Sequence, residues 1–189
     1  MAKIVIFVGS VRTDRQGIKV AKLFESKLVE RGHTVSIIDP VESQLPLLDK
    51  MFKELESPNK ELQKLHNIIN ESDGFLPITP EYNHSISSAL KNTIDYFQEE
   101  YFFKPTGIVS YSVGGFGGII AAQHLRIIFA ELGAPAISSS LPISKVQDVV
   151  DDAGNLKDKK YASHIERFLD EFDWYVEAFK NQREKGTPY

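Results

Sequence analysis

Residues 3–17 read KIVIFVGSVRTDRQG, an apolar run that ends at a glycine and passes into a polar segment with two arginines. The run is apolar at every position from residue 4 to residue 8 and does not alternate, which is typical of a strand covered on both faces. Residues 17–31 then carry apolar side chains at helical spacing. A strand followed directly by a helix predicts the first unit of a parallel α/β sheet.

The same unit recurs along the chain. Five apolar runs are expected to be strands, at residues 4–8, 34–38, 74–78, 107–111 and 136–141. Amphipathic patterns predict helices at residues 17–31, 59–72, 86–100, 118–132 and about 158–180. Right-handed crossovers leave few topologies for such a chain. They favour a flavodoxin-like three-layer sandwich, with a five-stranded parallel sheet of order 2-1-3-4-5.

Local signals mark the ends of several predicted helices. Gly32 and Gly133 each follow a helix, where glycine often takes the left-handed conformation that ends it. Ser57 and Pro58 are expected to start the second helix as its cap and its first residue. Two segments lack a periodic pattern: residues 40–57 are a candidate lid, and residues 147–160 are expected to form a polar surface loop.

Composition limits the classes of protein. The chain has 189 residues, a formal charge of −4 and no cysteine, and this length predicts a single domain over residues 1–189. Without cysteine, disulfides, thiolate metal sites, iron–sulfur clusters and thiol redox chemistry are excluded. No basic excess favours nucleic acid as a partner, and no apolar stretch is long enough to span a membrane. The first residues do not resemble a signal peptide, so we expect a cytoplasmic protein.

The predicted topology locates a ligand site. Ligands of open parallel sheets bind beyond the carboxyl ends of the strands, where the loops after strands 1, 3 and 4 meet in this order. The first loop, residues 9–17, opens a helix whose free amide groups and dipole favour an anion. Ser10 can donate a hydroxyl, and Arg12 and Arg15 can each grip a phosphate. The glycine patterns of dinucleotide and P-loop sites are absent, so a terminal monophosphate fits better; the alternative is an ordinary turn with two surface arginines.

The other two loops offer a planar slot lined by backbone. Residues 79–84, TPEYNH, contain Pro80, which stiffens the turn, and Tyr82, whose ring is a flat surface. Residues 111–118, YSVGGFGG, contain four glycines, which let the backbone approach a ligand closely. The plainer alternatives are a simple strand-to-helix turn and tight packing. With the phosphate loop, the two loops suit a mononucleotide with a large planar ring, and flavin mononucleotide (FMN) matches both ends.

These residues also carry a family resemblance. The chain resembles the NADPH-dependent FMN reductase family, which includes quinone, azo-dye and chromate reductases, over residues 3 to about 144. The matching pieces are Gly9-Ser10-x-Arg12, Pro80-Glu81-Tyr82-Asn83, Ala89-Leu90-Lys91-Asn92-x-Ile94-Asp95 and Ser112-x-Gly114 to Gly118. Arg15 and Gly17 depart from the commonest pattern, since many members have Ser and Asn at these positions.

The resemblance implies tightly bound FMN, NADPH or NADH as the reductant, and a homodimer or homotetramer with the flavin near a subunit interface. It also implies the cofactor-binding residues: Ser10, Arg12, Arg15, Gln16 and Gly17 for the phosphate, Pro80, Glu81, Tyr82 and Asn83 for the ring, and Ser112, Gly114 and Gly115 for the opposite side of the site.

The expected function is an FMN-dependent NAD(P)H oxidoreductase. Hydride would pass by a ping-pong mechanism to a small acceptor such as a quinone, free flavin, an azo compound or a metal oxyanion. No side chain is nominated as catalytic and no metal site is expected, because the five histidines are scattered. The alternatives are a flavodoxin-like electron carrier without NAD(P)H turnover and a non-redox α/β protein.

Aromatic residues are concentrated in one short segment. Tyr96, Phe97, Tyr101, Phe102 and Phe103 lie within eight residues, and one helix face cannot bury all five. We therefore expect part of this cluster to pack against a partner subunit. The alternative is burial beneath residues 40–57. Trp174 and Tyr175 are expected in core or interface packing.

Overall fold

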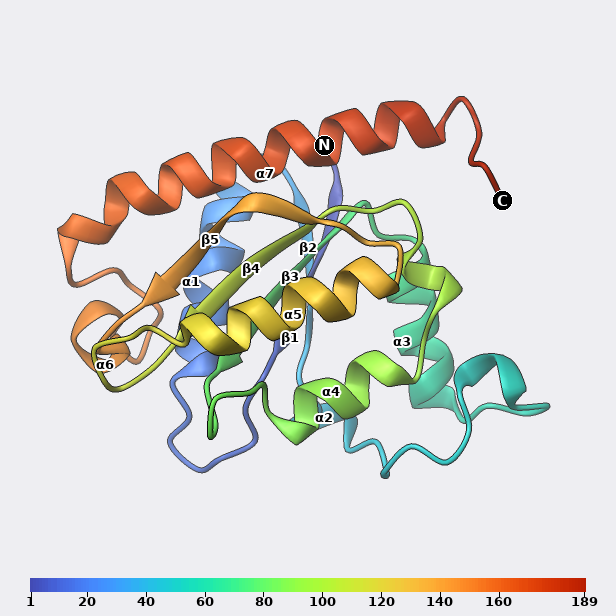
Figure 1. Ribbon diagram of the computed structural model, residues 1–189, viewed down its shortest axis with the longest axis horizontal. Helices are drawn as coiled ribbons and strands as arrows, with labels where there is room; N and C mark the ends of the chain where they lie inside the picture. The colour runs from blue at the N-terminus through green and yellow to red at the C-terminus, as the bar shows by residue number, and fades with distance from the viewer.

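The computed structural model describes residues 1–189 and confirms the predicted sheet order (Figure 1). All neighbouring strands are parallel, in the order β2-β1-β3-β4-β5. The strands are β1 (Lys3–Val8), β2 (Thr34–Ile38), β3 (Gly74–Pro80), β4 (Thr106–Tyr111) and β5 (Ala136–Ile143). The α-helices are α1 (Gly17–Glu30), α2 (Pro40–Ser43), α3 (Lys60–Asn70), α4 (Ser88–Asp95), α5 (Ile119–Glu131), α6 (Val146–Val149) and α7 (Ala162–Arg183). Short 3₁₀ helices are η1 (Phe52–Glu54), η2 (Glu99–Tyr101) and η3 (Lys159–Tyr161).

Two hydrophobic cores form because successive strand side chains point to opposite faces. On β1, Ile4, Ile6 and Val8 join the core beneath α1 and α7, whereas Val5 and Phe7 join the core beneath α3, α4 and α5. The sheet is therefore buried on both sides, as its unbroken apolar runs predict. None of the helices is both long and apolar enough to cross a bilayer.

The free edge of β5 is protected by side chains. The Arg126 guanidinium donates to the carbonyl oxygens of Ile137 and Ser138, each at 2.8 Å. The Glu171 carboxylate accepts from the Ser139 amide at 3.2 Å. Because these side chains occupy backbone groups of Ile137, Ser138 and Ser139, this part of the edge is less available to another strand.

The helix ends predicted from glycines are confirmed, but the predicted start of α3 is wrong. Gly32 and Gly133 both follow their helices with positive φ, at 83° and 64°. The cap of α3 is Asn59, whose side chain accepts from the Leu62 amide at 2.8 Å, so the assignment of Ser57 and Pro58 as cap and first residue is wrong. An asparagine carboxamide caps as well as a serine hydroxyl, and here it lies two residues closer to the apolar pattern.

The predicted helix 86–100 is interrupted. Ser87 caps α4 by accepting from the Leu90 amide at 3.1 Å, and α4 ends at Asp95. Gln98 has non-helical backbone angles, φ −142° and ψ −69°, before η2 begins. This break reorients the aromatic side chains that follow α4.

The aromatic residues are largely covered within the chain, so their number does not require a partner subunit. Tyr96, Phe97 and Tyr101 are buried in the core, because the break after α4 lets them enter it from different directions. Phe102 and Phe103 are half-buried next to the C-terminal Tyr189. The premise that one chain cannot bury most of the cluster is therefore wrong, and the packing of the half-buried Phe102 and Phe103 against a partner subunit stays a prediction.

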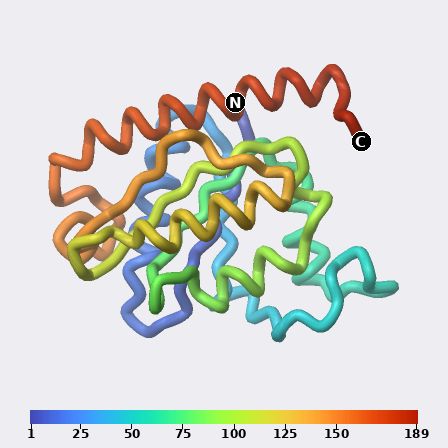
Figure 2. The backbone as a smooth tube through the Cα atoms, in the orientation of Figure 1, coloured from blue at the N-terminus to red at the C-terminus, as the bar shows by residue number.

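Residues 40–57, light blue to cyan in Figure 2, run from the end of β2 along the lower edge of the view, project to the right and return to α3. Asn92 on α4 donates to the Pro46 carbonyl at 2.8 Å and accepts from the Leu48 amide at 2.9 Å. Phe52 stacks on His66 of α3 at 4.1 Å between ring centres. The candidate lid is thus attached to α3 and α4. Residues 147–160 are more ordered than predicted, since they complete α6 and bury Val149.

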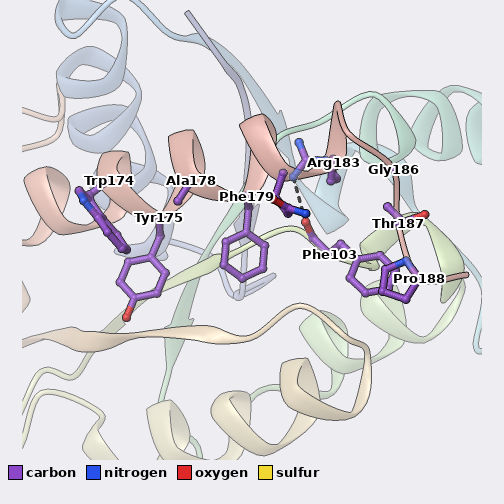
Figure 3. Close-up of a pocket in the computed structure, with 10 residues that line it drawn as sticks. Phe103, Trp174, Tyr175, Ala178, Phe179, Arg183, Gly186, Thr187 and Pro188 are labelled. Carbon is purple, nitrogen blue, oxygen red and sulfur yellow. Dashed lines mark hydrogen bonds between the residues drawn. The ribbon is translucent and has the colours of Figure 1, made fainter.

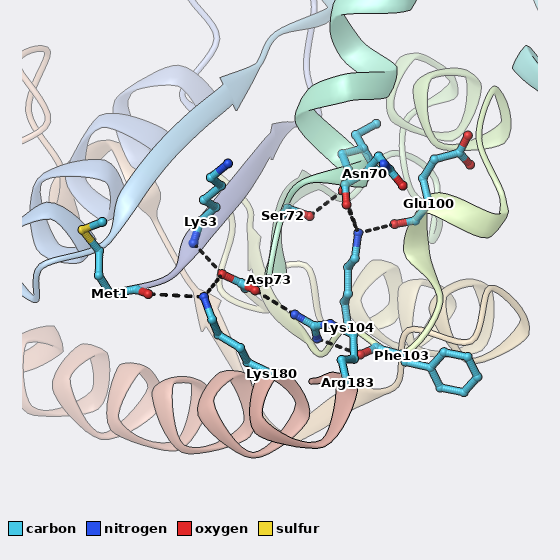
Figure 4. Close-up of polar contacts among 11 residues, drawn as sticks. Met1, Lys3, Asn70, Ser72, Asp73, Glu100, Phe103, Lys104, Lys180 and Arg183 are labelled. Carbon is cyan, nitrogen blue, oxygen red and sulfur yellow. Dashed lines mark hydrogen bonds and ion pairs between the residues drawn. The ribbon is translucent and has the colours of Figure 1, made fainter. Parts of the chain in front are cut away.

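A buried carboxylate attaches α7 to the amino-terminal edge of the sheet (Figure 4). Asp73 accepts from the Lys3 amide at 3.0 Å, from Lys180 Nζ at 2.9 Å and from Arg183 at 2.7 Å. Burial alone would raise the pKa of Asp73, but the hydrogen bonds from Lys180 and Lys3 outweigh it and the pKa is lowered. Nearby, Lys104 donates to three carbonyl groups, and burial lowers its pKa to about 8.

Asp73→Ala should lower the free energy of unfolding by about 2–3 kcal/mol, because three donors, two of them charged, lose their acceptor. Urea denaturation at neutral pH measures this loss. The lowered pKa means that the stabilisation is present above the ordinary carboxyl pKa and disappears as the pH falls through the native value. The difference between wild type and variant should therefore shrink in acid. Glu71→Ala, which removes an exposed pair with Lys3, is the control and should leave the midpoint unchanged; an equal loss there would contradict the role of Asp73.

Candidate cofactor-binding site

The loops after β1, β3 and β4 meet at the carboxyl edge of the sheet. The Gly9 amide donates to the Ile78 carbonyl at 2.8 Å, so the chain leaves β1 in contact with β3. A Cβ at Gly9 would lie only 2.7 Å from that carbonyl oxygen and 2.9 Å from Pro80. Glycine at this position is required for the close approach that brings the first loop to the second.

The first loop leaves hydrogen-bond donors free. The backbone amides of Val11 and of residues 13–16 donate to no protein atom, although they precede the amino terminus of α1. Arg12 is exposed, and its guanidinium makes no ion pair or hydrogen bond. Unpartnered amides, a helix amino terminus and a free guanidinium together form an environment that favours an anion.

Arg15, expected to bind phosphate, is engaged elsewhere. Its guanidinium donates to both carboxylate oxygens of Asp39 and to the Ser10 carbonyl, the latter at 2.8 Å. Asp39 is buried and also caps α2 by accepting from the Val41 amide at 2.9 Å. The Arg15–Asp39 pair therefore holds the shape of the first loop. Arg12 is then the arginine of this loop whose guanidinium is free. Sequence reasoning missed Asp39, which directly follows β2, although β2 was expected beside β1.

The Tyr111 side chain leaves no space for a side chain at position 17. A Cβ on Gly17 would lie 2.7 Å from the Tyr111 hydroxyl, which explains why a larger residue does not fit here. Burial raises the pKa of Tyr111 well above its usual value, so the hydroxyl stays neutral. Beside it, Gln16 has a buried Oε1 that accepts no hydrogen bond. An unpartnered acceptor of this kind suits a ligand hydroxyl.

The second loop is a tight turn joined to the first. Tyr82 and Ser85 exchange two backbone hydrogen bonds, at 2.9 and 3.0 Å. The two residues between them, Asn83 and His84, have positive φ, at 49° and 61°, as a type I′ turn requires. The Tyr82 hydroxyl lies 2.8 Å from Ser10 Oγ. The structure therefore brings together Ser10 and Tyr82, which the sequence placed in separate halves of the site.

Glu81 connects the second loop to α5. Its carboxylate accepts from the amides of Ile120 and Ala121, at 2.9 and 3.2 Å, and so caps the amino terminus of this helix. His84 is exposed, as expected of a loop residue, and its Nδ1 lies 3.4 Å from the other carboxylate oxygen. The sequence suggested only local bonds or backbone contacts for Glu81, because nothing in a single sequence shows a cap that is 39 residues away.

The third loop uses its glycines in two ways. Gly117 and Gly118 have positive φ, at 65° and 76°, and a Cβ on either would lie within 3.0 Å of another atom. Gly114 and Gly115 are exposed, with open space around them and free amides. Ser112 closes the loop, since its hydroxyl accepts from the Gly117 amide at 3.0 Å and donates to the Gly114 carbonyl at 3.1 Å.

The arrangement fits FMN on its chemistry. Free amides and Arg12 at the start of α1 suit a phosphate, and the Gln16 acceptor suits a ribityl hydroxyl. The exposed amides of Gly114 and Gly115 suit the polar edge of a ring. These features fit a mononucleotide site at the switch point of a flavodoxin-like α/β sheet.

Comparison with known proteins gives the family. Residues 2–148 match the model of the NADPH-dependent FMN reductase family, and the chain belongs to this family. A quinone reductase of Pseudomonas putida is 31% identical over 179 residues, covering 92% of this chain and 94% of the relative. An NAD(P)H-dependent FMN reductase of Pseudomonas aeruginosa is 30% identical over 159 residues, covering 81% and 84%.

A solved structure confirms the fold. The flavoenzyme NAD(P)H:(acceptor) oxidoreductase FerB of Paracoccus denitrificans superposes with a TM-score of 0.78 at 24% identity, covering 95% of this chain and 99% of that one. The expected fold, oxidoreductase class and cofactors are confirmed, since the family uses FMN and NAD(P)H. A non-redox α/β protein is set aside.

Glu81→Ala should weaken the start of α5 and lower the free energy of unfolding by about 1–2 kcal/mol, the usual effect of losing a helix cap. Hydrogen exchange should accelerate at the Ile120 and Ala121 amides, and chemical denaturation gives the total loss. Glu177→Ala, which removes an exposed carboxylate on α7, is the matched control. Unchanged exchange at both amides would show that Glu81 does not cap α5.

Proposed function

We propose that this chain is an FMN-dependent oxidoreductase that passes hydride equivalents from NAD(P)H to a small acceptor by a ping-pong mechanism. The observation that carries this proposal is the set of free amides around Arg12 at the amino terminus of α1, directly beyond β1. Because NAD(P)H is an intracellular reductant, we also propose that the protein works in the cytoplasm. The proposed acceptor classes are quinones, free flavin, azo compounds and metal oxyanions.

Each loop has a defined part in the proposed site. Ser10, Arg12, Gln16 and Gly17 line the phosphate end, where Arg12 supplies the charge and Arg15 keeps the loop in shape through Asp39. The ring would lie against Pro80, Tyr82, Asn83 and the backbone of Glu81 on one side and Ser112, Gly114 and Gly115 on the other. Glu81 acts through its carboxylate to position this loop against α5.

FMN supplies the hydride-accepting chemistry that the cysteine-free chain lacks. The protein contributes binding and orientation, and its backbone amides can stabilise negative charge on the ring edge. The strands form one parallel sheet, which has a single carboxyl edge for ligands. NAD(P)H and the acceptor should therefore use the same opening in turn, which is the basis for proposing ping-pong kinetics.

The proposed activity is tested by following NADPH oxidation with 1,4-naphthoquinone by the FMN-loaded protein. Initial rates at several concentrations of both substrates should give parallel double-reciprocal lines. Anaerobic NADPH alone should bleach the flavin absorption. A flavin that is bound but not bleached by NADPH or NADH would favour the alternative, an electron carrier that does not turn over NAD(P)H.

Arg12→Ala should weaken FMN binding by about 1.5–3 kcal/mol, the usual contribution of a charge-assisted hydrogen bond. Fluorescence titration of the apoprotein with FMN measures the dissociation constant, and riboflavin, which lacks the phosphate, should bind both proteins equally. Arg167→Ala removes an exposed arginine on α7 and serves as the control. Unchanged FMN affinity in Arg12→Ala would place the phosphate elsewhere.

We also propose that the chain assembles as a homodimer or homotetramer. An apolar groove of about 370 Å³ runs along α7 between Trp174, Phe179 and Phe103 (Figure 3). Trp174 is 66% exposed, which is unusual for so large an apolar side chain and supports a covered role in an assembly. Light scattering at micromolar concentration should give a multiple of the chain mass, and a strict monomer would contradict the proposal.

A further inference from the structure

The third loop is held by residues 144–147, which follow β5 and begin α6. In Figure 1 the loop lies beside α6, at the left of the view. Each of these four residues donates one hydrogen bond to a backbone carbonyl of the loop. The bonds run from Ser144 Oγ to Gly115 at 2.8 Å, from the Lys145 amide to Gly114 at 2.9 Å, from the Val146 amide to Ser112 at 3.1 Å and from Gln147 Nε2 to Val113 at 3.4 Å. Four consecutive carbonyls of the loop are therefore occupied, and we call residues 144–147 the carbonyl clamp.

These bonds also determine where the amides of the loop point. In a planar trans peptide the carbonyl of one residue and the amide of the next point in opposite directions. The amides of residues 113–116 must therefore point away from the carbonyl clamp. None of these four amides donates to a protein atom. The loop thus presents a row of four free donors on the side opposite the clamp.

The loop needs such bonds to keep one conformation. Gly114 and Gly115 have open space around them, and glycine has few steric limits on φ and ψ. A peptide plane between such residues can rotate unless a hydrogen bond holds its carbonyl. Ser144 is itself held in place, because its amide donates to the Tyr161 hydroxyl at 3.0 Å. The direction of the Phe116 amide therefore depends on one side chain, that of Ser144.

We propose that the carbonyl clamp orients the amides of residues 113–116 toward the polar edge of the flavin ring, and that Ser144 is a positioning residue for flavin reduction. Donors that are already oriented stabilise developing negative charge without a cost of reorganisation. Two-electron reduction adds negative charge to the polar edge of the ring, so these amides should favour reduced over oxidised FMN. This inference rests on the proposed function, since it names what tunes reduction at the same site.

The first test needs no cofactor. Relaxation of ¹⁵N in the apoprotein should give order parameters of about 0.85, typical of rigid backbone, for the amides of residues 113–116. Ser144→Ala removes the bond to the Gly115 carbonyl and should lower the value for the Phe116 amide below about 0.6, the range of flexible backbone. Ser144→Thr keeps a hydroxyl and should restore the rigid value. Flexible amides in the wild-type loop would overturn the clamp.

The second test measures the reduction potential of bound FMN. In Ser144→Ala, affinity for reduced FMN should fall about three- to fivefold more than affinity for oxidised FMN, the size expected of one lost hydrogen bond. For a two-electron couple this ratio makes the potential about 15–20 mV more negative. Spectroelectrochemical titration of the FMN-loaded protein measures the potential. Gln147→Ala should shift it less in the same direction, since its bond to Val113 is long, at 3.4 Å.

The potential also separates positioning from a purely structural role, which would lower the urea midpoint and leave the potential in place. Ser26→Ala is the matched control, because it removes another exposed hydroxyl, bonded to Glu30 on α1 at 3.3 Å. It should change neither the order parameters of the loop nor the potential. An unchanged potential in Ser144→Ala would overturn the positioning role. A wild-type protein that binds no FMN would overturn the proposed function, whereas the relaxation data on the apoprotein would still decide the clamp.

Discussion

A hydrogen bond between Ser10 Oγ and Tyr82 Oη, 2.8 Å apart, joins two loops that the sheet alone would leave independent. Strand pairing ends at Val8 and Ile78, so side chains must fix what lies beyond it. The Glu81 cap joins the second loop to α5, and the Arg15–Asp39 pair joins the first loop to the end of β2. Loops held in this way have little backbone freedom left to lose when a ligand binds. The low entropy cost favours tight cofactor binding.

The two departures from the common family pattern, Arg15 and Gly17, both lie in crowded surroundings at this edge. Arg15 is saturated by Asp39, and Gly17 has no room for a side chain beside Tyr111. In the proposed site, a phosphate would therefore meet the charge of Arg12 and the unpartnered amides that precede α1. Arg15 thus holds the shape of the first loop, whereas Arg12 remains free for a ligand. The sequence alone does not show which of the two arginines has which role.

The sheet could be predicted from the sequence because its inner strands, above all β1 and β3, carry continuous rather than alternating apolar runs, and this pattern has one physical cause, burial on both faces. The same strand order predicted where the candidate site lies, beyond the carboxyl ends of β1, β3 and β4. What the sequence could not show were contacts between distant residues: the Glu81 cap on α5, the Ser10–Tyr82 bond and the Asp39 partner of Arg15. The aromatic cluster was misjudged because the break at Gln98 depends on tertiary packing, and the helical pattern continues through it.

The central claim is that the loops after β1, β3 and β4 together hold FMN. The most direct test is a ¹H–¹⁵N titration of the apoprotein with FMN, read at each backbone amide. The amides of residues 11–17, 81–84 and 113–116 should shift, and those along α7 and around Asp73 should not. Shifts concentrated in the α7 groove, with the amides before α1 unmoved, would contradict the account.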